Sequence, residues 1–156
     1  MSEPTDYRIR KATVRDVPEV QKLINQFAKK EEMLPRSLNE LYEGLRDIFV
    51  CEKDGKIVGT CSLHIIWEDL AEVRSLAVKK ESQREGVGTK LVKKALKEAK
   101  ALGIKRVFVL TYTPEFFKRL GFKEIDKSTL PQKIWGECLK CHKFPECDEV
   151  ALIKEI

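Results

Sequence analysis

The spacing of apolar positions divides the chain into strands and helices. Apolar side chains three and four residues apart predict a helix, whereas alternation or a short continuous apolar run predicts a strand. Helices are predicted at 17–28, 38–45, 88–102 and, as a short one, 114–119. Strands are predicted at 7–11, 48–53, 56–67, 70–78, 106–110, 122–125 and 149–156. The order β-α-α-β-β-β-α-β-α-β-β indicates one α+β domain, residues 1–156, with a mixed central sheet flanked by helices.

Turn and capping residues support several of these boundaries. Asp54-Gly55 stands between two predicted strands, and this dipeptide is typical of a type I′ hairpin. Ser37 and Glu40 have the spacing of a capping box at the start of the second helix. Asp16 is placed to cap the first helix. Residues 7–11 are predicted as an edge or early strand.

Composition and charge narrow the class of protein. The chain has 156 residues and a formal net charge of +5, with Lys and Arg interleaved with Glu along amphipathic segments. This pattern favours solvated helix faces over a nucleic-acid surface. The first residues lack the apolar stretch of a signal peptide, and no apolar run is long enough to span a membrane. We therefore expect a cytoplasmic protein without a nucleic-acid or membrane partner.

Three of the five cysteines gather near the C-terminus. Their spacing, Cys138-x-x-Cys141-His142-x4-Cys147, resembles that of zinc ligands. A structural zinc ion is one interpretation, with a sheet cysteine as a further candidate ligand. Free thiols or a redox role are the alternatives. The odd number of cysteines and the lack of a secretion signal argue against a disulfide framework.

The segment QREGVGT, residues 83–89, carries the clearest chemical signal. Gly86 and Gly88 allow a tight turn between a strand and a helix, and the amides at a helix N-terminus attract anions. The segment is neither a Walker loop nor a complete dinucleotide fingerprint, because position 91 is Leu. On its own it predicts either a pyrophosphate cradle or an ordinary strand-to-helix turn.

Taken together, three motifs resemble the GNAT N-acetyltransferases. Gln83-x-x-Gly86-x-Gly88 follows an apolar strand as in their acetyl-CoA-binding motif, residues 116–122 resemble their second signature, and residues 54–59 resemble their β2–β3 hairpin. The resemblance implies the GNAT acyl-CoA N-acyltransferase fold. It also implies direct transfer of an acetyl group from acetyl-CoA to an amine in a ternary complex.

A closer resemblance concerns the acceptor. Residues 33–37, 71–78, 107–111 and 130–138 resemble the acetyltransferase domain of bacterial N-acetylglutamate synthases, in its short stand-alone form. This implies L-glutamate as the acceptor, as in the first step of arginine biosynthesis, and pairing as a homodimer. Another amino acid, a small amine or a protein N-terminus is the alternative acceptor. A non-catalytic zinc or nucleic-acid-binding module is the alternative outside the enzymes.

The GNAT resemblance also assigns roles to residues of this chain. It places the cofactor on Leu76, Ala77, Val78, Gln83, Arg84, Glu85, Gly86, Val87, Gly88, Thr89 and Phe117. The Leu76 N–H is the expected donor to the carbonyl oxygen on which charge develops. Glu72 is the candidate base acting through water, with a structural glutamate as the alternative. Many members carry a Tyr on the short helix where this chain has Phe116 and Phe117. Tyr112 is therefore the candidate substitute acid, with a core or rim tyrosine as the alternative, and the thiolate can also leave without direct protonation.

The acceptor's carboxylates call for donors of a particular kind. Arginine binds a carboxylate through two parallel N–H donors, which lysine does less well. Arg36 and Arg74 lie in the segments that resemble the synthases and are the candidate carboxylate-binding residues, with surface arginines as the alternative. Thr111 and Thr113 are candidates for additional hydrogen bonds to the acceptor.

Overall fold

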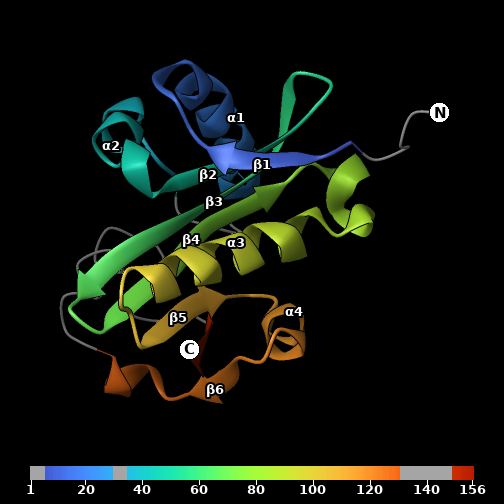
Figure 1. Cartoon of the computed structure of the whole chain (residues 1–156). Coiled ribbons are helices and arrows are strands. Elements are labelled where there is room, and N and C mark those ends of the chain that lie inside the picture. The colour runs from blue at the N-terminus through green and yellow to red at the C-terminus, as the bar shows by residue number, and fades with distance from the viewer. Residues whose placement is uncertain (1–5, 30–34, 131–148) are drawn as a thin grey trace. The chain divides into compact units, whose positions relative to one another are not determined.

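The computed structural model describes residues 6–29, 35–130 and 149–156 (Figure 1). Its strands form a seven-stranded sheet in the order β1-β2-β3-β4-β5-β7-β6. Their bounds are β1 Arg8–Lys11, β2 Ile48–Lys53, β3 Lys56–Trp67, β4 Leu70–Val78, β5 Arg106–Thr111, β6 Lys123–Ile125 and β7 Val150–Glu155. The helices are α1 Val17–Ala28, α2 Leu38–Glu43, α3 Val87–Ala101 and α4 Pro114–Arg119, with short 3₁₀ turns η1 Val14–Asp16, η2 Leu45–Asp47, η3 Lys80–Glu85 and η4 Lys127–Thr129.

The predicted order of helices and strands is confirmed. The sheet is mixed, since β4 and β5 pair in parallel whereas β1–β2, β2–β3, β5–β7 and β6–β7 pair antiparallel. Asp54 and Gly55 both have positive φ, 54° and 75°, as a type I′ turn requires. The Ser37 hydroxyl accepts the Glu40 N–H at 3.1 Å, and the Glu40 carboxylate accepts the Ser37 N–H at 3.1 Å, which confirms the capping box.

Contacts within the chain divide it into two compact units. The first comprises residues 1–63 and 73–98, and the second comprises residues 64–72 and 99–156. The first unit holds β1, β2, α1, α2 and the turn that leads into α3. None of the helices within the described ranges is both long and apolar enough to cross a membrane.

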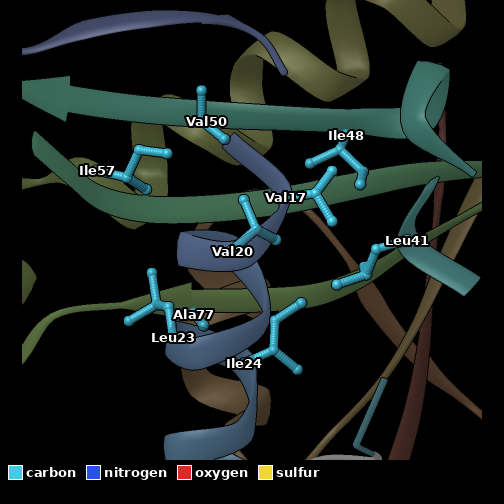
Figure 2. Close-up of a cluster of buried hydrophobic side chains, with 9 residues drawn as sticks. All are labelled: Val17, Val20, Leu23, Ile24, Leu41, Ile48, Val50, Ile57 and Ala77. Atoms are coloured by element: carbon cyan, nitrogen blue, oxygen red, sulfur yellow. The ribbon is translucent and has the colours of Figure 1, made fainter. Parts of the chain in front are cut away.

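The core of the first unit lies between α1 and the strands. Figure 2 shows the α1 side chains directed toward residues of β2, β3 and β4. This cluster consists of Val17, Val20, Leu23, Ile24, Leu41, Ile48, Val50, Ile57 and Ala77. The helical spacing of the apolar residues in α1 brings them onto one face, which confirms that part of the sequence analysis.

A β-bulge changes which side chains of β3 face α1. Gly59 pairs with Cys51, but Glu52 pairs with Ile57, so Val58 is an extra residue between two pairs. Ile57 therefore belongs to the α1 side of the strands, whereas Gly59 lies on the opposite side, where it approaches α3. The Val58 carbonyl accepts the Lys79 N–H at 2.8 Å, immediately after β4 ends.

The second unit contains β5, β6, β7 and α4. β7 pairs with β5 along six residues, from Thr111 opposite Val150 to Arg106 opposite Glu155, and it pairs with β6 on its other side. Its buried cluster is formed by Leu70, Phe108, Leu130 and Ala151. Helix α4 contacts β6 and β7.

Two local predictions were wrong. Asp16 precedes α1, but its side chain does not cap that helix. It accepts the Thr13 N–H at 2.7 Å instead and is bound by Arg10, because η1 occupies the preceding turn. The second helix was predicted at 38–45, but α2 ends at Glu43 and Leu45 belongs to η2.

Candidate functional site

Strand β4 departs from a regular strand at Ser75. Its φ of 55° lies in the left-handed region, which is uncommon for residues other than glycine. Arg74, Ser75 and Leu76 are all partly exposed, between buried Val73 and Ala77, so the usual alternation of buried and exposed positions is interrupted. Such a break re-aims backbone N–H groups and is common at functional sites. An amide in this segment is therefore suited to donate to a substrate oxygen.

The turn after β4 is held to the sheet by two hydrogen bonds and is closed by a third within it. The Lys79 N–H donates to the Val58 carbonyl, and the Ser82 N–H donates to the Lys79 carbonyl at 2.8 Å. The side-chain amide of Gln83 donates to the Val78 carbonyl at 3.0 Å. Gln83 is a predicted cofactor-binding residue, and its side-chain N–H group anchors the turn to the end of β4.

Helix α3 begins with backbone amides that precede its first intrahelical bond. Gly86 has a φ of 79°, and a β-carbon built on it would meet open space, so its conformation rather than crowding favours glycine. The first α3 hydrogen bond runs from the Lys90 N–H to the Gly86 carbonyl at 3.0 Å. The amides of Val87, Gly88 and Thr89 therefore stand at the positive end of a 15-residue helix, which suits an anionic group such as a diphosphate.

Glycine at position 59 allows α3 to approach β3 closely. A β-carbon at Gly59 would lie 3.0 Å from Val87 Cγ1, 3.0 Å from Leu91 Cδ1 and 3.5 Å from Val78 Cγ2. Val87 and Leu91 are fully buried. The contact fixes the first turn of α3 against the first unit's strands, so Gly59 contributes to the position of the amides described above. In the sequence, Gly59 is part of the hairpin motif at 54–59, which gives no sign of this contact with α3.

Arg36 lies between α1 and α2. Its N–H donates to the Asn25 side-chain oxygen at 3.3 Å, and its carbonyl accepts from the Gln21 side-chain amide at 3.2 Å. Its guanidinium lies 3.6 Å from a Glu40 carboxylate oxygen, and its side chain is only 11% exposed. Arg74 is partly exposed on β4, beside Ser75. Both predicted acceptor arginines therefore belong to the first unit.

The predicted base and the predicted threonines belong to the second unit. Glu72 is buried and pairs with Phe108 of β5, and β4 continues beyond it to Val78. Thr111 is buried at the end of β5, where its hydroxyl oxygen accepts the Thr113 N–H at 2.9 Å and lies 3.0 Å from the Thr113 hydroxyl. These bonds shape the turn between β5 and α4. Tyr112 lies in that turn and is partly exposed.

The second signature forms α4 and the turn after it. Phe117 is buried, with its ring 5.0 Å from that of Phe116 and 5.4 Å from that of Phe122, both in edge-to-face geometry. Gly121 has a φ of 93°, and a β-carbon there would collide with Lys154 Nζ. The structure thus gives Phe117 a packing role, whereas its predicted contact with the cofactor stays a prediction.

The predicted metal ligands Cys138, Cys141, His142 and Cys147 lie outside the described residues. Within the part of the chain that is described, no group of three or more His, Cys, Asp or Glu side chains is placed to hold a metal ion. Cys51 and Cys61 are buried free thiols. Burial raises the pKa of Cys61 to about 12, and burial is also the main cause of the raised pKa of Cys51.

An ion cluster near β1 was missed by the sequence analysis. Arg10 donates two hydrogen bonds to Asp16, at 2.7 and 3.0 Å, and one to Glu52 at 2.8 Å. The Arg10 hydrogen bond lowers the pKa of Asp16 to about 2, with the Thr13 N–H contributing, although burial opposes the shift. Ser75 was missed as well, because a serine inside an apolar strand gives no signal of a positive φ.

Comparison with protein families and with individual proteins gives consistent matches for this chain. Residues 14–122 match the acetyltransferase (GNAT) family. An uncharacterised N-acetyltransferase of Chlorobaculum tepidum is 40% identical over 151 residues, which is 97% of this chain and 97% of that protein. An amino-acid acetyltransferase of Mycobacterium tuberculosis is 36% identical over 144 residues, covering 89% of this chain and 82% of that protein.

Solved structures give the same assignment. A Mycobacterium tuberculosis protein crystallised with CoA and NLQ superimposes with a TM-score of 0.83 at 30% identity, over 96% of this chain and 99% of that one. N-acetylglutamate synthase from Neisseria gonorrhoeae, in complex with coenzyme A and N-acetyl-glutamate, gives a TM-score of 0.88 at 25% identity. That match covers 99% of this chain and 36% of the synthase.

Sequence and fold therefore agree with the resemblance drawn from the motifs. The family match includes the β2–β3 hairpin, the turn before α3 and the α4 signature, and the related structures share the mixed sheet flanked by helices. The chain belongs to the GNAT acetyltransferase family and is an acetyl-CoA-dependent N-acetyltransferase.

Proposed function

We propose that the chain acetylates the α-amine of L-glutamate, the first step of arginine biosynthesis. The observation that carries the proposal is the similarity to the amino-acid acetyltransferase of Mycobacterium tuberculosis along 89% of this chain. The fold of the Neisseria gonorrhoeae synthase, crystallised with coenzyme A and N-acetyl-glutamate, supports the same acceptor. Two arginines in the first unit provide donors of the kind that a dicarboxylic amino acid needs.

The proposed cofactor site follows β4 into α3. Acetyl-CoA supplies the acetyl group as a thioester. The amides of Val87, Gly88 and Thr89 bind its diphosphate at the positive end of α3. The remainder of the cofactor lies along the end of β4, on Leu76, Ala77 and Val78. The site is completed by the turn before α3, which consists of Gln83, Arg84, Glu85 and Gly86. The hydrogen bonds that hold this turn to β3 and β4 support its rigidity.

The proposed chemistry uses one amide and two side chains. The amine nitrogen bonds to the thioester carbon, the carbon–sulfur bond breaks, and a proton leaves the amine. The Leu76 N–H donates to the carbonyl oxygen on which negative charge develops. Glu72 accepts the amine proton through a water molecule, and Tyr112 donates a proton to the departing thiolate. The irregular backbone at Ser75 supports the role of the Leu76 amide, since it interrupts the strand next to that residue.

The proposed acceptor site is defined by charge. Glutamate carries two carboxylates, and the guanidinium groups of Arg36 and Arg74 each offer paired donors. The low exposure of Arg36 favours this role, because a charge-assisted hydrogen bond is stronger where water is scarce. In this proposal, the hydroxyls of Thr111 and Thr113 donate additional hydrogen bonds to the acceptor.

A direct test measures CoA release from acetyl-CoA with each of the twenty amino acids. The proposal predicts the highest kcat/KM with L-glutamate and a smaller value with L-glutamine or L-aspartate. No release with any amino acid would contradict the proposal and point to a different amine acceptor. Small amines and a peptide N-terminus complete the panel, since a clear preference for either would replace glutamate.

A further inference from the structure

Tyr7 joins the start of the first unit to the turn before α3. Its hydroxyl donates a hydrogen bond to a carboxylate oxygen of Glu85, a residue 78 positions away in the sequence. Its ring faces two ammonium groups, with Lys53 Nζ 5.0 Å and Lys90 Nζ 5.9 Å from the ring centroid. Tyr7 therefore contacts an anion and two cations at once, and all four residues belong to the same unit.

The position of Glu85 creates an electrostatic problem. Glu85 is the last residue of η3, and only Gly86 separates it from Val87, the first residue of α3. A carboxylate near the amides that open a helix repels an incoming diphosphate and can itself accept their N–H groups, as anions do at helix N-termini. The Tyr7 hydroxyl supplies this carboxylate with a different donor.

The two lysines add the opposite charge nearby. Lys90 belongs to the first turn of α3, and its N–H makes the first hydrogen bond of that helix. Its ammonium group and that of Lys53 both lie near the Tyr7 ring, which attracts cations through its π-electrons. The aromatic ring thus gathers two positive charges, one of them on a residue of the first turn of α3, while the hydroxyl donates to the Glu85 carboxylate.

We propose that Tyr7 is a positioning residue for the anionic part of CoA, because it restrains Glu85 and gathers Lys53 and Lys90 beside the first turn of α3. This inference rests on the proposed binding of CoA at that turn. It assigns Tyr7 no contact with the reacting atoms. It predicts an effect on CoA affinity and on the KM for acetyl-CoA, with kcat unchanged.

Isothermal titration with CoA tests the inference through a double-mutant cycle. Tyr7→Phe keeps the ring and removes only the hydroxyl, and we expect it to weaken CoA binding about fivefold at low salt. Glu85→Gln removes the charge, so Tyr7→Phe in that background is expected to leave the affinity unchanged. Tyr7→Leu also removes the ring and is expected to weaken binding more than Tyr7→Phe. Tyr42→Phe, at an exposed tyrosine of α2, is the matched control.

The titrations either support or overturn the inference. Suppression of the Tyr7→Phe effect by Glu85→Gln, together with its reduction at high salt, supports the inference. An equal effect of Tyr7→Phe in both backgrounds, or no effect in either, overturns it. Amide chemical shifts of residues 87–89 in the unmodified protein, recorded with and without CoA, separate the two proposals. If CoA leaves those amides unchanged, the proposed cofactor site itself is wrong.

Discussion

A β-carbon placed on Gly59 of β3 would lie 3.0 Å from Cγ1 of Val87, the first residue of α3. The strand and the helix therefore approach as closely as they do because one side chain is missing. The amides of Val87, Gly88 and Thr89 depend on this approach for their position. A structural glycine in the hairpin is thus linked to the proposed diphosphate site.

Substitution of Gly59 tests this link. Gly59→Val should lower the free energy of unfolding by about 1–3 kcal/mol, because the added carbons overpack a filled interface. It should also raise the KM for acetyl-CoA, since the first turn of α3 must move. Urea unfolding and steady-state kinetics measure the two effects. Lys56→Val, at an exposed position of the same strand, is the control. An unchanged KM in a folded Gly59→Val protein would separate Gly59 from the cofactor site.

The ion cluster at Arg10 predicts a specific pH dependence of stability. The pKa of Asp16 falls from 3.8 to about 2 in the folded chain, chiefly because Arg10 donates hydrogen bonds to it. Its stabilising contribution is therefore complete above pH 3.8 and is lost as the pH falls toward 2. The shift corresponds to about 2 kcal/mol at neutral pH.

Urea unfolding of Asp16→Asn between pH 7 and pH 2.5 measures this contribution. The variant should be less stable than the unmodified chain at pH 7, and the difference should shrink as the solution is acidified. Asp6→Asn, at an exposed aspartate, is the control and should show no such convergence. A difference that stays constant with pH would show that the Asp16 charge does not stabilise the fold.

Of the two arginines proposed to bind the acceptor, Arg74 gives the more specific kinetic prediction. Arg74→Ala should raise the KM for the amino-acid acceptor about 10- to 100-fold, the range expected for the loss of hydrogen bonds to a charged group. The KM for acetyl-CoA should change little. Arg119→Ala, at an exposed arginine of α4, serves as the control. Equal increases in both KM values would remove Arg74 from the acceptor site.

The zinc hypothesis makes a separate prediction. Protein purified without chelators should contain one zinc ion per chain, and Cys138→Ser or Cys141→Ser should abolish it. Cys61→Ser tests the sheet cysteine as a further ligand: zinc that is retained removes Cys61 from the ligand set, and zinc that is lost adds it. Metal analysis by mass spectrometry measures both. Protein without zinc would leave free thiols or a redox role as the interpretations of the cluster.

Local sequence signals predicted much of the fold. The Asp54-Gly55 turn and the Ser37–Glu40 capping box depend on neighbouring residues alone, and both were confirmed. The helical spacing in α1 also predicted its buried face. The role of Asp16 was predicted wrongly because its side chain is bound by Arg10, a residue of β1 that lies outside helix α1.

The candidate site was less accessible to sequence reasoning. Two glycines made the segment 83–89 recognisable in the sequence. The positive φ of Ser75, in contrast, depends on tertiary structure and leaves no signal in the sequence. The contact of Tyr7 with Glu85 joins residues 78 positions apart, so no local pattern could indicate it. The role of Gly59 could not be predicted from its place in the hairpin motif either. Only the packing of Val87 and Leu91 against it shows that α3 approaches β3 closely at this residue.

The most direct test of the account follows backbone amides during a titration with CoA. A ¹⁵N-labelled sample should show its largest amide shift changes at Val87, Gly88 and Thr89, because the diphosphate accepts their N–H groups. Dephospho-CoA, which keeps the diphosphate, should shift the same three amides. Saturable CoA binding that leaves these three amides unshifted, with the changes elsewhere in the chain, would contradict the central claim.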